Sequence, residues 1–313
     1  MNTFGNQFRL TTFGESHGPA VGGVIDGCPA GIVIDHTFIE HELQRRRDGD
    51  DNTPQGLTTR HEADHVEWLS GLIDNTTLGT PLSFIVRNTD CRPEDYEPFR
   101  HLCRPGHADY TYTAKYGLRD HRGGGRASGR ETVARVVAGA VAKQILKVKG
   151  ITFRSSHHDH EIHCIIEGVA AGMGNPIFDR LNARLSYAML SIPSAMAFAM
   201  GDTPDAFRLS QQSFPDQWRH LGEGNTLTHT NHCCGIQGGI SNGMPIIFHI
   251  GFHLPPTLPV EMNCRDAEGN LHTVPPQGRH DSNHLSRLPV IVEAMAALVI
   301  LDMSLQQQTP HQP

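Results

Sequence analysis

The most informative segment of the sequence is His121-Arg122-Gly123-Gly124-Gly125-Arg126-Ala127-Ser128-Gly129-Arg130-Glu131-Thr132. Ser128 with Glu131 three residues later is typical of a capping box, and apolar residues then recur at helical spacing, which predicts a helix over 128–148. A helix start exposes unpaired amide hydrogens and partial positive charge. A glycine cluster alone is typical of a solvated loop, but three arginines beside a capped helix favour a site for a phosphate or carboxylate.

The composition is that of a globular protein: 313 residues, 38% hydrophobic and 19% charged, with a formal net charge of −7. This balance argues against a nucleic-acid partner, and positive charge is instead local, as suits a small anionic ligand. Seven cysteines without a Cys-x-x-Cys pair fit a reducing compartment. No signal peptide and no membrane-spanning run is expected, so we predict a cytoplasmic protein.

The remaining chain predicts an α+β fold, because strands and helices do not alternate as a doubly wound parallel sheet requires. We expect strands at 21–26, 66–72, 82–86, 162–169 and 245–252, and helices at 37–47, 128–148, 176–190 and 289–303. Thr37 with Glu40 predicts a second capping box, and Phe178 is expected to face the core with Leu181, Leu185 and Met189. Residues 88–125 are expected to form a long functional loop.

Two pairs of similar sequence segments suggest an internal duplication. Gly27-x-x-Ala30-Gly31 before one helix resembles Gly168-x-x-Ala171-Gly172 before another, and Gly125-Arg126 resembles Gly278-Arg279. We therefore predict one domain of residues 1–313, built from two similar halves of residues 1–150 and 151–313.

Two histidines and one aspartate are candidates for proton transfer. His17 and His107 are both flanked by glycine in predicted loops, and histidine titrates near neutrality. Asp281 directly precedes the last helix, where a capping role is the alternative.

The ordered set of motifs resembles the chorismate synthase family, over nearly the whole chain. The matching segments are Thr12-Phe13-Gly14-Glu15-Ser16-His17-Gly18, Arg104-Pro105-Gly106-His107-Ala108-Asp109-Tyr110, Gly123 to Thr132, Gly174-x-Pro176-x-Phe178-Asp179, Gly278-Arg279-His280-Asp281 and Glu293-Ala294-Met295. The resemblance implies a β-α-β sandwich, a homotetramer, and a lyase of the shikimate pathway for aromatic amino acid biosynthesis. That enzyme converts 5-enolpyruvylshikimate 3-phosphate to chorismate and phosphate by anti-1,4-elimination, and it requires reduced FMN.

The resemblance also implies residue roles. His107 would supply a proton to reduced flavin, His17 would protonate the departing phosphate, and Asp281 would help to remove the ring proton. The implied flavin contacts are Arg126, Ala127, Ser128, Gly238, Thr257 and Arg279, and the implied substrate contacts are Arg45, Arg46, Arg104 and Arg130. No separate NADPH-binding domain is recognised, which implies that an external flavin reductase supplies the reduced cofactor.

The sequence departs from the family pattern at four segments. Asp48 replaces a proline after Arg45-Arg46-Arg47 and is followed by Asp50 and Asp51, and His253 to Thr257 replaces a Lys-Pro-Thr-Ser segment. Met196-Ala197 replaces a Lys-Gly pair, and residues 151–163 are shorter than usual. These changes leave a second interpretation open: a diverged, weak or inactive relative that binds flavin or an anion. The histidine-rich residues 157–164 allow a metal site as a third interpretation, although a solvated connector is favoured and no metal ligand is assigned.

Overall fold

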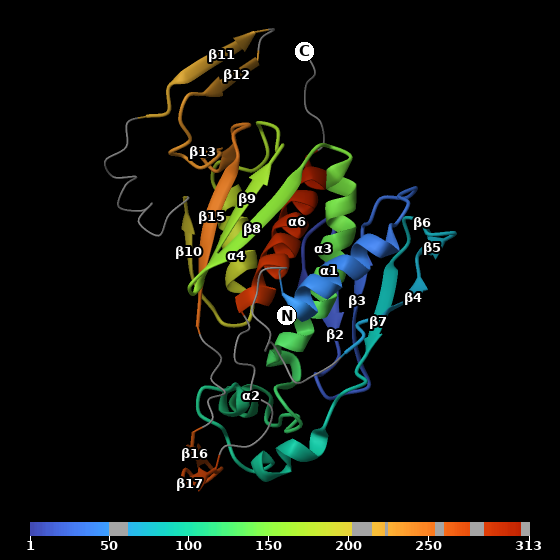
Figure 1. Ribbon diagram of the computed structural model, residues 1–313, viewed down its shortest axis with the longest axis vertical. Helices are drawn as coiled ribbons and strands as arrows, with labels where there is room; N and C mark the ends of the chain where they lie inside the picture. The colour runs from blue at the N-terminus through green and yellow to red at the C-terminus, as the bar shows by residue number, and fades with distance from the viewer. Residues whose placement is uncertain (50–61, 202–214, 223–224, 254–259, 276–284, 308–313) are drawn as a thin grey trace.

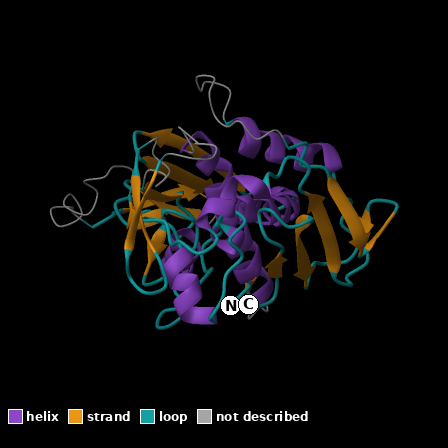
Figure 2. Cartoon of the chain, turned by 90° about the horizontal axis from the view of Figure 1, so that it is seen from below, coloured by secondary structure: helices purple, strands orange, loops and turns teal. Residues whose placement is uncertain are grey.

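The structure is a computed structural model that describes residues 1–49, 62–201, 215–222, 225–253, 260–275 and 285–307. Two antiparallel sheets lie on either side of a central layer of helices, and a smaller group of elements lies below them (Figures 1 and 2). This arrangement confirms the predicted α+β sandwich. The sheets are called the N-terminal sheet and the C-terminal sheet below.

The N-terminal sheet has the strand order β1-β2-β3-β7-β4. Its strands are β1 (Thr3–Phe4), β2 (Arg9–Phe13), β3 (Ala20–Asp26), β4 (Val66–Ser70) and β7 (Leu82–Arg87). Leu82, Phe84 and Val86 alternate along β7 and are fully buried, because one face of the sheet packs on the helices.

The C-terminal sheet has the order β8-β9-β15-β10. Its strands are β8 (Thr152–His158), β9 (Glu161–Glu167), β10 (Ala195–Met200) and β15 (Ile246–Phe252). Ile162, Cys164 and Ile166 alternate along β9 and are fully buried. The predicted histidine-rich connector was wrong: residues 154–163 form most of a tight β8–β9 hairpin.

The central layer consists of α3 (Thr132–Lys147) and α6 (Leu288–Gln306), flanked by α1 (His36–Asp48) and α4 (Leu181–Leu190). From Leu288 to Met303 every residue of α6 is buried, so its sequence is apolar all round. The segment Leu285–Gln306 is long and apolar enough to cross a bilayer by composition, but it lies mostly inside the protein. Burial of each large aliphatic side chain of α6 stabilises the fold by roughly 1.5–3 kcal/mol.

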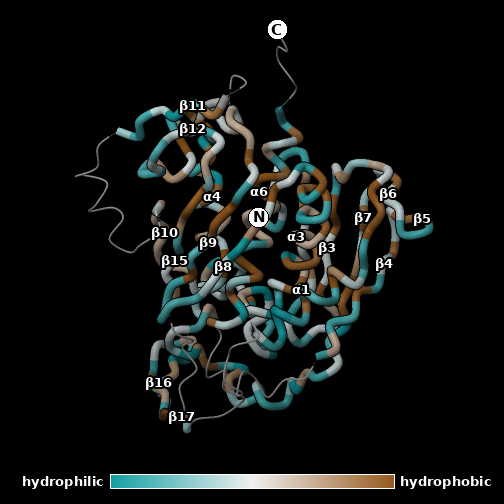
Figure 3. Tube along the Cα trace, turned by 45° about the horizontal axis from the view of Figure 1, so that its top comes forward, coloured by the Kyte–Doolittle hydropathy of each residue, from teal (hydrophilic) through white to brown (hydrophobic). Residues whose placement is uncertain are grey.

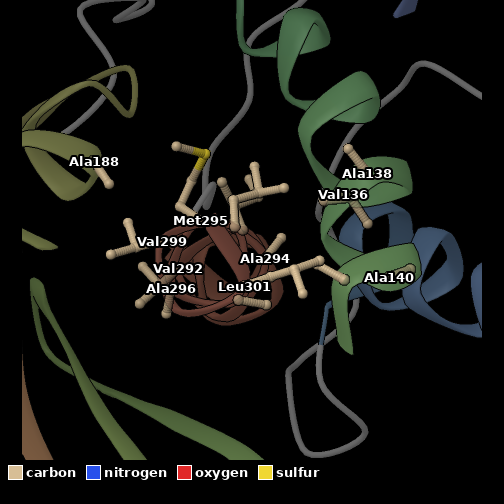
Figure 4. Packing of buried hydrophobic residues seen from close by; sticks show 14 of the residues in the cluster. Val136, Ala138, Ala140, Ala188, Val292, Ala294, Met295, Ala296, Val299 and Leu301 are labelled. Carbon is tan, nitrogen blue, oxygen red and sulfur yellow. The ribbon is translucent and has the colours of Figure 1, made fainter. Parts of the chain in front are cut away.

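The two central helices approach closely at Gly139. A Cβ atom at this position would lie 2.3 Å from the Cβ atom of Ala294 in α6. Figure 4 shows α6 seen end-on, with Ala294 on the side of α3 and Val299 on the side of α4. In Figure 3 hydrophobic stretches follow the central helices and the strands that face them.

The two sheets repeat one topology. The order of elements is β2, β3, α1, β4, β7, α3 in the first half and β8, β9, α4, β10, β15, α6 in the second. The spatial orders β2-β3-β7-β4 and β8-β9-β15-β10 correspond strand by strand. Gly27 follows β3 and Gly168 follows β9, and both have positive φ. A Cβ atom on Gly27 would collide with a backbone carbonyl just before β2, and one on Gly168 with a carbonyl just before β8.

The group below the sandwich contains short elements. The predicted long loop in fact holds a 3-10 helix, η1 (Pro93–Phe99), and the helix α2 (Asp109–Tyr116), and a hairpin of β16 (Met262–Arg265) and β17 (Leu271–Val274) pairs through Arg265 with Cys103. A second small core of Phe99, Met262, Cys264 and Val274 holds this group together. The other short elements are β5 (Leu72–Ile73), β6 (Thr76–Thr77), β11 (Trp218–Gly222), β12 (Asn225–Thr228), β13 (Ile236–Gln237), β14 (Ile240–Ser241) and η4 (Leu285–Arg287).

Two local predictions were wrong. The N-cap of α1 is Asp35, whose carboxylate accepts from the Phe38 amide, rather than Thr37. The helix α4 begins only at Leu181, because Asp179 adopts positive φ, and Phe178 is 84% exposed. Leu181, Leu185 and Met189 are buried as expected.

Candidate functional site

A cavity of about 1010 Å³ lies where the sandwich meets the smaller group of elements. The C-terminal end of α1 and the N-terminal ends of α3 and α6 all contribute to its wall, as do residues of the segment 96–130. Helix N-termini carry partial positive charge, so two of these ends favour an anion in the cavity.

The segment 121–132 (the arginine turn) enters α3 through two 3-10 turns, η2 (Gly125–Ala127) and η3 (Gly129–Glu131). Gly123 and Gly125 have positive φ, which lets the chain reverse beside the cavity. The Ser128 hydroxyl accepts from the Arg130 amide at 3.3 Å. The predicted capping box is therefore only half present.

Glu131, the other half of that box, has different partners. Its carboxylate accepts from the Thr12 hydroxyl at 2.8 Å and from Arg135 at 2.8 Å. It therefore ties the start of α3 to β2. Ala127 and Ser128 line the cavity, as predicted for ligand contacts.

Arg46 and Arg130 line the cavity and share one buried carboxylate. Asp64, which is 5% exposed, pairs with the guanidinium groups of both. Arg46 also donates to Thr132 Oγ1 at 3.0 Å, and Arg130 donates to Asn88 Oδ1 at 2.9 Å. These interactions therefore hold the guanidinium groups of Arg46 and Arg130 in place in the absence of a ligand.

Arg104, which also lines the cavity, is held in the same way. Its guanidinium donates to both carboxylate oxygens of Asp109, at 2.8 and 3.0 Å, and to the Gly123 carbonyl at 3.2 Å. Burial alone would raise the pKa of Asp109, but the hydrogen bonds and charge of Arg104 hold it below its usual range. Arg126 lines the cavity and donates to Thr12 Oγ1 at 2.6 Å.

His107 lies in the cavity wall, half-buried. Its Nδ1 donates to the Pro105 carbonyl at 2.9 Å, because a carbonyl can only accept. The neutral ring therefore leaves Nε2 as the nitrogen that can exchange a proton. Burial lowers the pKa of His107 below its usual value, and the nearby Arg104 charge lowers it further.

His17 lies behind the same wall. It occupies the loop between β2 and β3, and its ring contacts Tyr96 and the backbone of Gly123, which both line the cavity, although His17 itself does not. The Ser16 hydroxyl lies 3.1 Å from its Nδ1. His107 therefore lines the cavity directly, whereas His17 contacts two residues that line it.

Arg45 does not line the cavity, and its predicted contact with substrate stays a prediction. It forms a two-point ion pair with Glu293 of α6, at 2.9 and 3.1 Å, and does not line the cavity. Lys143 joins Glu293 to Glu42 in the same buried cluster. Burial would raise the pKa of Glu293, but Lys143 and Arg45 lower it to about 2. This cluster locks α1 to α3 and α6.

The remaining predicted contacts lie outside the cavity wall or outside the described residues. Gly238 lies between β13 and β14, away from the residues that line the cavity. Thr257, Arg279 and Asp281 lie outside the described residues, as do Asp50 and Asp51.

The departures from the family pattern have structural counterparts. Asp48 pairs with Arg47 of the cavity wall at 2.8 Å through both carboxylate oxygens, and His253 also lines the cavity. Within the described parts of the chain, no cluster of three or more His, Cys, Asp or Glu side chains could hold a metal ion, so nothing in them supports the metal interpretation.

The wall residues that were not predicted include Asp64, Tyr96 and Arg119. Asp64 follows a polar loop and carries no local motif, while Tyr96 and Arg119 belong to the segment that was expected to be functional as a whole. The aromatic content of that segment was the signal that could have found Tyr96.

Comparisons with known proteins agree with this geometry. The family model for chorismate synthase matches residues 8–161 and 159–305. The two matches meet in the β8–β9 turn. The alignments with relatives are longer than the 313 residues of this chain, so the relatives carry residues that it lacks.

Relatives called chorismate synthase are similar over nearly their whole length. Those of Parabacteroides distasonis and Bacteroides thetaiotaomicron are each 41% identical to this chain, covering 99% and 98% of it and 99% of each relative. The crystal structure of a chorismate synthase superposes with a TM-score of 0.73 over 97% of this chain and 93% of that one, and at 23% identity it shows the shared fold. The chain belongs to the chorismate synthase family.

Proposed function

We propose that this chain converts 5-enolpyruvylshikimate 3-phosphate to chorismate and phosphate, with reduced FMN as cofactor, in the cavity at the helix ends. The observation that carries the proposal is that the arginine turn opens into a cavity that His107 also lines. The volume of about 1010 Å³ lies at the upper end of the usual range for ligand sites, as two ligands require.

The substrate carries carboxylates and a phosphate, which suit the fixed guanidinium forks of Arg46, Arg104 and Arg130. Charge-assisted hydrogen bonds to such groups contribute roughly 1.5–3 kcal/mol each. Because these arginines are already held by Asp64, Asp109 and backbone carbonyls, little order is lost when the substrate binds.

The wall also fits the cofactor. A buried Nη1 atom of Arg119 has no hydrogen-bond partner among the described residues, so this polar atom is available to an anionic ligand. Ile192, Leu288 and Ile291 give the wall an apolar side suited to a flavin ring. Arg126, Ala127 and Ser128 would hold FMN, together with Thr257 and Arg279. When bound, reduced FMN lends the substrate an electron and recovers it.

The proton-transfer roles follow from the two imidazoles. His107 would take up a proton at Nε2, and the resulting imidazolium would pass that proton to the bound flavin. Its lowered pKa keeps the ring neutral near neutral pH in the free protein, and a bound phosphate would raise that pKa and favour the imidazolium. His17 would protonate the departing phosphate, and Asp281 would assist removal of the ring proton.

Four broader features belong to the same proposal. The chain forms one domain with halves of residues 1–150 and 151–313, which the repeated topology supports. It assembles as a homotetramer, it acts in the cytoplasm, and an external flavin reductase supplies the reduced cofactor. Family membership supports these features.

An anaerobic assay of chorismate formation with chemically reduced FMN tests the function. The wild-type chain should turn over, and His107→Ala should lower kcat by roughly 10²- to 10⁴-fold with an unchanged melting temperature. His101→Ala, which changes an exposed histidine of the same segment, is the matched control. If the wild-type chain binds FMN and yields no chorismate, the inactive-relative interpretation is correct. Unchanged kcat in His107→Ala would remove this residue from the mechanism.

A further inference from the structure

We propose that Tyr96 is the positioning residue of His17 and that it sets His17 relative to the His107 loop. This inference rests on the proposed roles of the two histidines. Tyr96 lies in η1 and lines the cavity. No sequence motif marked it.

Tyr96 contacts both histidine loops. Its ring lies edge-on to the His17 imidazole, with 4.8 Å between ring centroids and 68° between ring planes. The Arg104 guanidinium also lies over this ring, 5.6 Å from the Tyr96 centroid. Arg104 begins the turn that carries His107, so one aromatic ring contacts both loops.

The His107 side of this contact is fixed independently. Arg104 is 8% exposed, pairs twice with Asp109, and also lies 5.4 Å from the centroid of Phe99. Tyr96 itself packs on the second small core through Phe99 and its neighbours. The ring therefore acts as a rigid wall against which His17 rests.

The other sides of the imidazole are closed by the backbone and by Ser16. A Cβ atom on Gly123 would lie 2.4 Å from His17 Nδ1, so the ring packs directly on that glycine. The Ser16 hydroxyl contacts the same Nδ1. Removal of Tyr96 takes away a side chain of the cavity wall that contacts the imidazole.

Proton transfer depends steeply on donor position, and a misplacement of about 1 Å can cost roughly 100-fold in rate. If Tyr96 only positions His17, a change at Tyr96 should lower kcat while KM stays nearly constant. A substrate-binding role would raise KM instead. A purely structural role would lower the melting temperature.

The test compares Tyr96→Leu, Tyr96→Phe and Tyr187→Leu in the anaerobic assay with reduced FMN. Tyr96→Leu should lower kcat at least about tenfold with KM within about threefold. Tyr96→Phe keeps the ring and should recover most of kcat. Tyr187→Leu, which changes a tyrosine of α4 stacked on Phe4, should behave as wild type.

His17→Ala is assayed in parallel to separate the proposed role of His17 from the positioning role of Tyr96. If His17→Ala keeps full turnover, the proposed function of His17 is wrong. If His17→Ala is impaired while Tyr96→Leu is not, the positioning role of Tyr96 is wrong. The positioning role is also overturned if Tyr96→Leu changes mainly KM, or if Tyr96→Phe is as impaired as Tyr96→Leu.

Discussion

The two halves of the molecule share a topology but present opposite surfaces to the same cavity. In the first half the end of α1 contributes Arg46 and Arg47, and the approach to α3 contributes Arg126 and Arg130. The equivalent end of α4 in the second half leads into Ile192, Pro193 and Ser194, and α6 begins with Leu288 and Ile291. The first half thus gives the cavity a side rich in arginine, and the second half gives it a mostly apolar side to which Arg287 and His253 also belong.

This difference shows how a repeated framework supplies a site with two kinds of wall. The repeated topology brings the ends of α1, α3 and α6, and the segment that follows α4, to the cavity. The position of the wall residues therefore follows from the topology. The side chains at those ends then differ in charge, so that phosphate groups and an aromatic ring system can be held side by side. Figure 1 shows these ends meeting above α2.

The junction of the halves is the contact between α3 and α6, and Gly139→Val should break it. The new side chain would start 2.3 Å from Ala294 Cβ and 2.5 Å from its Cα, so the helices would have to move apart. Overpacking of this kind costs about 3 kcal/mol at the upper end of its usual range. Chemical denaturation should show this loss in the free energy of unfolding.

Gly251→Ala in β15 is the control for that substitution, because its Cβ atom would meet only Ala197 at an ordinary 3.5 Å. It should change the free energy of unfolding by less than about 1 kcal/mol. Equal stability of Gly139→Val and wild type would show that the helices are not in close contact.

Much of this framework was readable from sequence. The buried strands at β3, β7 and β15 and the apolar helices α3 and α6 have strong local patterns, and the glycine echoes pointed to the repeat. Strand β9 matches the strand expected at 162–169, but β8 was missed because serine, histidine and arginine take most of its positions in place of typical strand residues. Phe178 was misplaced because helical spacing alone does not reveal the positive φ at Asp179.

Residues of the cavity wall were predictable where they belong to a local motif. The arginine turn, Arg104 and His107 line the cavity as expected. Arg45 was not separable from Arg46 by sequence, because only the packing of α1 turns one toward Glu293 and the other toward the cavity. Asp64 and Tyr96 act through residues distant in sequence, which no local pattern encodes.

A pair of conservative substitutions sharpens the contrast between the two walls. Arg130→Lys keeps the charge but loses the planar fork, and should raise KM for the substrate about tenfold, as expected for one lost charged hydrogen bond. Ile192→Val removes one methyl group from the apolar wall and should weaken FMN binding by less than about tenfold.

Salt distinguishes the two effects. Raising ionic strength should weaken substrate binding in wild type, and should leave the ratio of FMN affinities between Ile192→Val and wild type unchanged, because screening acts on charges. Titrations at two salt concentrations provide the measurement. If Ile192→Val raised KM for the substrate as much as Arg130→Lys did, the division of the cavity into two walls would be wrong.

The smallest expected effect concerns Asp48, whose carboxylate partly neutralises the positive charge of the cationic wall. It lies at the C-terminal end of α1, where the helix dipole disfavours an acid, and Arg47 compensates it through two contacts of 2.8 Å. The hydrogen bond and charge of Arg47 lower the pKa of Asp48 despite its partial burial, so the carboxylate stays ionised at neutral pH. Asp48→Asn should therefore free Arg47 and tighten binding of inorganic phosphate.

The gain should be below about fivefold, because an exposed ion pair contributes only about 1 kcal/mol or less. Calorimetric titration of the flavin-free protein with phosphate measures it without requiring turnover. Glu67→Gln is the matched control, since it releases Arg87 from a similar two-point pair outside the cavity and should leave phosphate affinity unchanged. Weaker phosphate binding in Asp48→Asn would mean that Asp48 holds Arg47 in its binding position, so the aspartate would then support the cationic wall that it was expected to oppose.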